Sequence, residues 1–206
     1  MSIDISSLDS MQIDVLKEIG NIGAGNAVTA LSKMVSKRID MKVPKVNILE
    51  FKEVADLVGG PDVLVAGIYF GVKGDIDGSI MFLIDINSSK MLANLLLGKN
   101  EIKEDKDLDE MELSALQELG NILAGSYLSS LSSLTGLSTG VSVPSIAIDM
   151  AGAILSVPLI LFGQVGDHVL LIETQFIEGE NHVKGNFFLI PEEKSFKILL
   201  ESLGVA

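Results

Sequence analysis

Apolar side chains recur every three or four positions near the start of the chain, which is the period of an amphipathic helix. They are Leu8, Met11, Val15, Ile19 and Ile22. About a quarter-turn away, Asp14, Glu18 and Asn21 form a narrow polar stripe, because residues spaced by four and three share one helix face. We therefore predict a helix whose apolar stripe faces the core and whose acid and amide project outward together.

The same design returns one hundred residues later. Residues 14–27, DVLKEIGNIGAGNA, are matched by residues 114–127, SALQELGNILAGSY. The second polar stripe is Ser114, Glu118 and Asn121, and its apolar neighbours are Met111, Ala115, Leu119 and Ile122. Identical pairs at this offset include Glu18 and Glu118, Gly20 and Gly120, Asn21 and Asn121, Ile22 and Ile122, Ala24 and Ala124, Gly25 and Gly125, and Pro44 and Pro144. The chain is therefore an internal duplication.

Between the helices of the first repeat, the pattern changes to that of strands. Pro44 and Pro144 each follow a valine and open a segment of alternating character, VPKVNILEF or VPSIAIDM. This pattern indicates a strand entered through a proline. Two apolar runs, residues 62–72 and 78–86, flank the turn KGDIDG and predict a hairpin. Residues 88–98 then predict a helix that ends at Gly98.

The second repeat continues in the same order. Apolar runs at 167–177 and 186–191 surround a turn expected at 178–185, and Pro191 and Gly204 are placed to begin and end a closing helix. Each half therefore reads helix, helix, strand, hairpin, helix. Short extra helices are expected at KEVADLV and MAGAILS.

This order predicts an α+β fold in which two halves, related by a pseudo-twofold axis, share one β-sheet with helices packed on it. A length of 206 residues suits one domain or two closely packed halves. We expect a single domain made of the repeats 1–100 and 101–206. The charged run EIKEDKDLDE, residues 101–110, is interpreted as a solvated connector that leads into a helix.

Composition narrows the classes of function. A hydrophobic share of 48% indicates a folded globular chain, and a net charge of −13 argues against nucleic acid and anionic membrane surfaces as partners. The absence of cysteine excludes disulfides and thiolate sites and favours a cytoplasmic location. We expect no signal peptide and no membrane insertion, because residues 153–162, the most apolar window, are too few to span a bilayer.

The glycine-rich run GNIGAGNA resembles a nucleotide-binding loop only superficially. It lacks the preceding strand and the residue order of a dinucleotide fingerprint, and it lacks the Gly-Lys-Ser/Thr of a P-loop. We interpret its glycines as places where two helices, or a turn of the chain, approach closely.

The Glu-x-x-Asn pair invites a chemical interpretation because it persists in both copies while most neighbouring positions differ. An exposed polar face is the ordinary explanation of such residues, but solvation alone gives no reason for this retention. An amide does not titrate, so the pair is a poor acid–base set, and two histidines without thiols make a dedicated metal cage improbable. An amide can instead orient an attacking water in phosphoryl hydrolysis, and the acid can anchor a basic residue on the phosphoryl carrier.

The full spacing is Asp or Ser, three residues, Glu, two residues, Asn, then twenty-two residues to Pro. It resembles the signature of the CheC, CheX and FliY family of chemotaxis phosphatases. The signature occurs twice, as Asp14, Glu18, Asn21 and Pro44 and as Ser114, Glu118, Asn121 and Pro144. The resemblance covers essentially the whole chain, and two copies without a further rotor domain are typical of the CheC members.

The resemblance implies hydrolysis of the aspartyl phosphate of the response regulator CheY-P. Asn21 and Asn121 would enter the regulator's active site and position the water, while Glu18 and Glu118 would pair with the regulator's lysine. The Mg²⁺ ion would be supplied by CheY, so no cofactor or metal of its own is expected. Asp14, Ser114, Pro44 and Pro144 would be supporting members of the motif, and Gly20 and Gly120 would leave room for the partner to come close.

The family also implies a second partner, the receptor deamidase CheD. We expect its contact at the segment AIDMAGAIL around Asp149, because this segment exposes small residues and has no close counterpart in the first half. A buried helix is the competing interpretation of the same segment.

Three classes of function stay open on the sequence. A CheY-P phosphatase with two sites is the first. The second is a binding module, either an adaptor of the flagellar-switch type, like the middle domain of FliM, or chiefly a regulator of CheD. An independent small-molecule hydrolase fits worst, because the chain offers no convincing metal or base.

Overall fold

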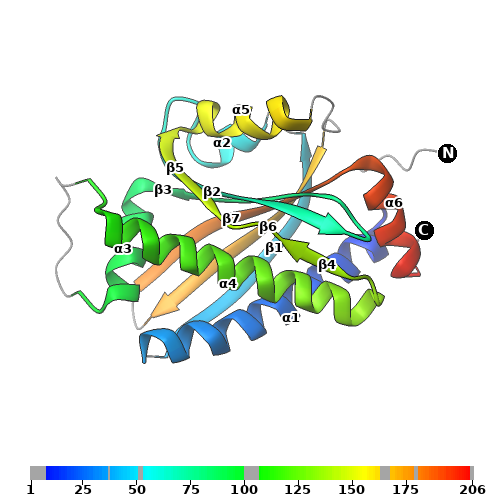
Figure 1. Ribbon diagram of the computed structural model, residues 1–206, viewed down its shortest axis with the longest axis horizontal. Coiled ribbons are helices and arrows are strands. Elements are labelled where there is room, and N and C mark those ends of the chain that lie inside the picture. The colour runs from blue at the N-terminus through cyan, green and yellow to red at the C-terminus, as the bar shows by residue number, and fades with distance from the viewer. Residues whose placement is uncertain are drawn as a thin grey trace.

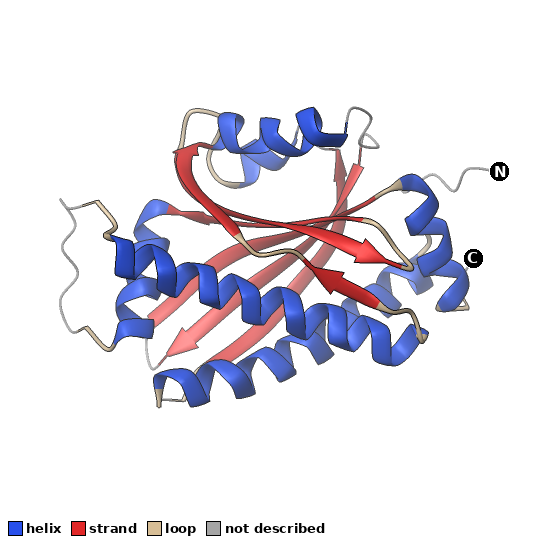
Figure 2. Cartoon of the chain, viewed as in Figure 1, coloured by secondary structure: helices blue, strands red, loops and turns tan. Residues whose placement is uncertain are grey.

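The computed structural model describes residues 8–36, 38–50, 53–99, 107–162, 168–178 and 181–204. A curved sheet forms the middle of the molecule, with the long helices α1 and α4 side by side on one face and α2 and α5 on the other (Figure 1). Figure 2 shows the same layers by type of element. The elements in chain order are α1 (Ser10–Val35), β1 (Asp40–Glu50), α2 (Val54–Leu57), β2 (Leu64–Gly74), β3 (Gly78–Asp85), α3 (Ile86–Leu97), α4 (Glu110–Thr135), β4 (Thr139–Val141), β5 (Ser145–Met150), α5 (Ala151–Phe162), β6 (His168–Glu178), β7 (Asn181–Pro191) and α6 (Glu193–Ser202).

The strands of the two repeats interleave in one antiparallel sheet. Their order is β1-β6-β7-β3-β2-β4, and β5 also pairs with β2. The first strand of each repeat therefore pairs with the hairpin of the other repeat, and β3 meets β7 at the centre, where Phe82 lies opposite Phe187. This order reads alike from both edges, which confirms the predicted α+β fold and the shared, pseudo-twofold sheet.

Helix α1 is continuous from Ser10 to Val35, so the expectation of two helices before the first strand is wrong. Its length is matched by α4, and both begin with a capping box: Asp9 with Gln12, and Asp109 with Glu112. Such reciprocal bonds satisfy backbone donors that a helix start leaves free. The glycine-rich run does not break α1, because the helix packs on a neighbour along this stretch and tertiary contacts outweigh the low helix propensity of glycine.

The predicted apolar stripe is only partly confirmed, because Ile19 and Leu119 are buried as expected but the methionines of both stripes face outward. Met11 and Met111 are 66% and 64% exposed, and Ile22 is also exposed. The buried positions of α1 are Leu16, Ile19, Gly20, Gly23, Ala24, Ala27 and Leu31. Small residues carry little hydrophobic weight in a pattern, but they let a helix lie close to the sheet and to a second helix. Close packing, rather than side-chain size, therefore decides which face is inward.

The second hairpin turn is shorter than predicted. β7 begins at Asn181 and runs through Gly185, which was expected in the turn. Gly185 pairs with Thr174 of β6, and a Cβ on it would overlap with Cζ of Phe82 on β3. The glycine is therefore required by the ring that covers it. The predicted helix ends are confirmed at Gly98 and Gly204, which adopt the left-handed conformation after α3 and α6. The predicted helix start at Pro191 is wrong, because Pro191 ends β7 and α6 begins at Glu193.

We expect Gly185→Ala to destabilise the chain by about 1–3 kcal/mol, because an added methyl group must displace a buried ring. Urea denaturation followed by circular dichroism measures this loss. The matched control is Gly140→Ala in β4, where a Cβ would meet nothing within 4 Å. Equal midpoints for the two variants would contradict the expected overlap with Phe82.

Candidate active site

The two motif helices pack against each other at a close crossing. A Cβ on Gly23 of α1 would lie 3.1 Å from Cα of Tyr127 on α4, so glycine is needed where the backbones meet. Beside the crossing, Nδ2 of Asn26 donates to Oγ of Ser130 across 3.2 Å. These contacts hold the two helices as one surface layer over the sheet (Figure 1).

The first motif stripe lies on the outer face of α1. Asp14, Glu18 and Asn21 are exposed, and Glu18 and Asn21 are one helical turn apart on the same side. Among the residues that the structure describes, neither side chain makes a hydrogen bond or an ion pair. The acid and the amide are therefore available to a partner.

The second motif stripe has the equivalent place on α4. Ser114 and Glu118 are exposed and Asn121 is half-buried. Within the described part of the chain, Glu118 and Asn121 also have no hydrogen bond or ion pair. The structure thus presents two acid–amide pairs on neighbouring helices, as the helical spacing predicts.

Gly20 and Gly120 face the sheet and not the outer surface. A Cβ on Gly20 would lie 3.4 Å from Cγ1 of Val43, and one on Gly120 would lie 3.0 Å from Cγ2 of Ile68. The idea that these glycines make room for a partner is therefore wrong. They let each helix approach the sheet closely, and so they set the distance between the sheet and the neighbouring asparagine.

The prolines of the motif lie where the first strand of each repeat is irregular. Pro44 falls in β1 at a break in register between Lys42 and Lys45, and its side chain lies outside the described residues. Pro144 lies between β4 and β5, and its carbonyl accepts from Nε2 of Gln117 at 3.3 Å. The contact of Gln117 was not predicted, because the sequence of a helix does not show which distant loop a glutamine side chain will reach.

The two sites differ in what surrounds them. Val43 is buried, whereas its counterpart Val143 is 86% exposed. The loop that carries Val143 is anchored by Ser142, whose amide and hydroxyl bond to Gly71, and by Gln117. The second site therefore has a fixed apolar side chain on a loop tied to α4, and the first does not.

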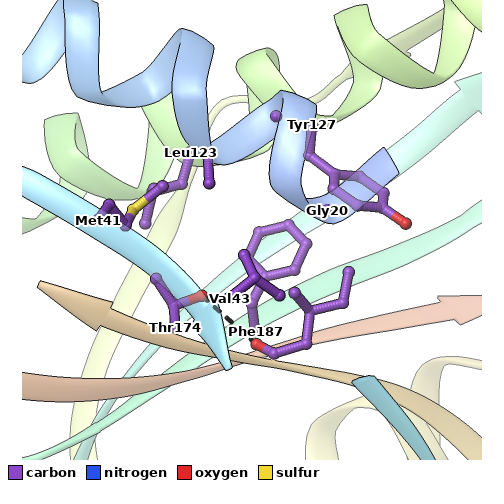
Figure 3. Close-up of a pocket in the computed structure, with 10 residues that line it drawn as sticks. Gly20, Met41, Val43, Leu123, Tyr127, Thr174 and Phe187 are labelled. Atoms are coloured by element: carbon purple, nitrogen blue, oxygen red, sulfur yellow. Dashed lines mark hydrogen bonds between the residues drawn. The ribbon is translucent and has the colours of Figure 1, made fainter. Parts of the chain in front are cut away.

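A small cavity lies on the inner side of the helices. Its volume is about 20 Å³, and it lies between Gly20, Leu123 and Tyr127 of the helices and Met41, Val43, Thr174 and Phe187 of the sheet (Figure 3). That space holds about one water molecule. Burial raises the pKa of the Tyr127 hydroxyl far above its usual value, so this group stays neutral. The cavity is too small for a substrate, and any chemistry of the motif residues belongs to the outer face.

Asp149 lies near the end of β5, two residues before the start of α5. Its side chain is exposed, and Oδ1 accepts from the amide of Met150 at 2.7 Å. The segment is divided between surface and core, because Met150, Gly152 and Ala153 are exposed while Ile154 and Leu155 are buried. The expected short helix is the start of α5, which is longer than α2, its counterpart in the first repeat.

In the described ranges, no three His, Asp or Glu side chains are grouped so that they could hold a metal ion. None of the helices in these ranges is both long and apolar enough to cross a membrane.

The motif segments match a known family. The CheC-like family matches residues 11–48 and 111–148, which contain both copies of the acid–amide pair and both prolines. The CheY-P phosphatase CheC of Bacillus subtilis (strain 168) is 39% identical over 209 residues, covering 100% of both chains. The chain belongs to the CheC-like family. The two equally spaced matches also confirm the internal duplication of this CheC-like chain.

Solved structures agree with the fold of the CheC-like chain. The crystal structure of Thermotoga maritima FliY has a TM-score of 0.78 at 26% identity and covers 96% of this chain and 98% of its own. The CheX–CheY–BeF3–Mg²⁺ complex of Borrelia burgdorferi gives a TM-score of 0.53 at 20% identity, with 85% and 97% covered. At that identity the second likeness supports the fold alone.

Proposed function

We propose that the chain is a CheY-P phosphatase, which hydrolyses the aspartyl phosphate of the response regulator on the outer face of α1 and α4. The observation that carries this proposal is the pair of outward-facing Glu-x-x-Asn sets at equivalent places on two packed helices, whose side chains make no hydrogen bond or ion pair with any described residue. The name of the Bacillus relative, identical at 39% of positions over its full length, supports the same substrate.

In this proposal the asparagine positions the nucleophile. The amide of Asn21 or Asn121 enters the regulator's active site and hydrogen-bonds the attacking water in line with the acyl phosphate. The water oxygen forms a bond to phosphorus, and the bond between phosphorus and the aspartate oxygen breaks. The products are inorganic phosphate, which keeps the protons of the water, and the unphosphorylated aspartate side chain of the regulator. Because an amide neither gains nor loses a proton at neutral pH, its contribution is position.

The glutamate orients the partner in the same proposal. Glu18 or Glu118 pairs with the regulator's lysine through a charge-assisted hydrogen bond. One helical turn separates the acid from the amide, so the pair sets how the helix lies on the regulator and thereby where the amide reaches. Mg²⁺ is supplied by the regulator in this proposal, which requires no metal site on this chain.

The test is the decay of phosphorylated CheY, with its Mg²⁺, in the presence and absence of the full chain. A shorter phosphoryl lifetime supports the proposal. A stable complex with the regulator or with flagellar rotor proteins, at an unchanged lifetime, would turn the interpretation to an adaptor.

We propose in addition that CheD binds around Asp149. The support is an exposed carboxylate near the end of β5 beside the exposed residues Met150 and Ala153. A regulatory role through CheD is compatible with hydrolysis, because this segment and α4 lie on opposite faces of the sheet (Figure 1).

We expect Asp149→Asn to weaken CheD binding about tenfold or more, since a charged partner of a hydrogen bond contributes on the order of 1.5–3 kcal/mol. Titration calorimetry with purified CheD measures the loss. The matched control is Asp107→Asn, an exposed aspartate just before α4. Equal affinities for the two variants would remove Asp149 from the interface.

A further inference from the structure

Many identical pairs of α1 and α4 have a task in the fold. Asp9 and Asp109 cap the helices, and Leu16, Ala24, Leu31 and their counterparts are buried. Ser32 bonds to Ile39, and Ser132 lies within hydrogen-bond distance of the Thr139 hydroxyl. The fold therefore accounts for these pairs.

A second group of identical pairs lies outward, and among the described residues its members have no such task, except that Ile122 packs partly against the core. Its members are Met11, Glu18, Asn21, Ile22 and Gly25 with Met111, Glu118, Asn121, Ile122 and Gly125. All are exposed apart from Asn121 and Ile122, which are half-buried. At about 100° per residue, the five positions fall within an arc of roughly 100°, and they extend about 21 Å along each helix. We call these two sets the outer stripes.

Gly25 and Gly125 are the most informative members of the outer stripes. A glycine inside a helix is destabilising relative to alanine. Gly23 and Gly120 are explained by close contacts, but a Cβ on Gly25 or Gly125 would meet no described residue within 4 Å. Packing within the chain therefore gives no reason for a glycine at either place. Each follows the motif asparagine by four residues, so it lies directly beside that asparagine on the same face.

We propose that the outer stripes are the docking surface for the phosphorylated response regulator, with the regulator approaching each helix most closely at Gly25 or Gly125. Met11 and Ile22, with their counterparts, supply the apolar contacts on either side of the acid–amide pair. The inference rests on the proposed function, because the stripe is centred on the residues that act on the phosphoryl group. Methionine suits this place, since its flexible side chain adapts to a partner surface.

The decisive variant is Gly25→Ala with Gly125→Ala. Its thermal midpoint should rise by a few degrees, because alanine favours the helix and the added methyl group meets open space. Its KM for CheY-P should nevertheless rise about tenfold, with a parallel loss of affinity for CheY carrying Mg²⁺ and beryllium fluoride, measured by titration calorimetry. A second variant, Met11→Ala with Met111→Ala, should weaken the same binding at an unchanged midpoint.

The matched control is Ser133→Ala, an exposed position of α4 two turns beyond Gly125 whose hydroxyl bonds back to Ser129. It should favour the helix and leave KM unchanged. A stabilised glycine variant with unchanged KM and affinity would overturn the docking surface and leave the phosphatase proposal intact. A destabilised glycine variant would overturn the premise that the fold has no need of these glycines. No acceleration by the unaltered chain would remove both proposals together.

Discussion

Replacing Asn21 and Asn121 together by alanine should abolish the acceleration of CheY-P decay, a loss of about a hundredfold or more. The reason is that a water held even ~1 Å out of line reacts on the order of a hundredfold more slowly. The chain should stay folded, because Asn21 is exposed, Asn121 is half-buried, and neither side chain has a hydrogen bond to any described residue. Stopped-flow or radiolabel decay of phosphorylated CheY, with circular dichroism of each variant, measures both outcomes.

The control for this double variant is Asn87→Ala, an exposed asparagine on α3. This variant should accelerate the decay of CheY-P as much as the unaltered chain does. Retained acceleration in the double variant would disprove the role of the asparagines, whatever the fold of the chain.

The single variants apportion the two sites. The second site has Val143 held outward by Ser142 and Gln117, whereas Val43 is buried beneath the first site. If the anchored loop contributes to binding, Asn121→Ala removes more activity than Asn21→Ala. Equal losses would mean that the acid, the amide and the outer stripes suffice.

The duplication made much of the fold predictable from sequence. Two equal spacings of acid, amide and proline indicated two equivalent helices and strands, and the hairpin turns indicated one sheet. The pairing of β1 with β6 and of β2 with β5 was not predictable, because each strand joins the hairpin of the other repeat. Strand exchange between repeats leaves no trace in the hydrophobic pattern of either one.

Errors in the prediction share one physical cause, which is contact with distant residues. Gly185 resembled a turn residue, but its place is set by Phe82 from another strand. Met11 was placed in the core, but Gly23 and Ala27 allow a closer approach and take the inward face. The outward direction of Glu18 was predictable, because a helix period fixes which residues share a face. Whether a glycine serves the fold or a partner was not, as the contrast between Gly20 and Gly25 illustrates.

Replacing Glu18 and Glu118 together by glutamine should raise the KM for CheY-P by about ten- to a hundredfold and change kcat much less. A hydrogen bond to a charged group contributes on the order of 1.5–3 kcal/mol, and glutamine keeps the shape while removing the charge. The KM of the unaltered chain should rise with salt, and that of the variant should depend on salt less, because screening acts on an ion pair. Initial rates over a range of CheY-P and salt concentrations measure both effects.

The kinetic constant that each substitution changes distinguishes a glutamate that binds the regulator from one that takes part in the reaction. If the glutamate anchors the regulator's lysine, its loss appears in KM and in the salt dependence, while loss of the asparagine appears in kcat. If the glutamine variant instead loses kcat at an unchanged KM, the acid acts on the reacting water, and the role given to it here is wrong. Glu201→Gln, an exposed glutamate on α6, is the matched control and should leave both constants unchanged. Glu18 and Asn21 lie one turn apart on the same helix, so docking by the glutamate positions the asparagine. Replacing either residue should therefore change the kinetic constants without changing the fold.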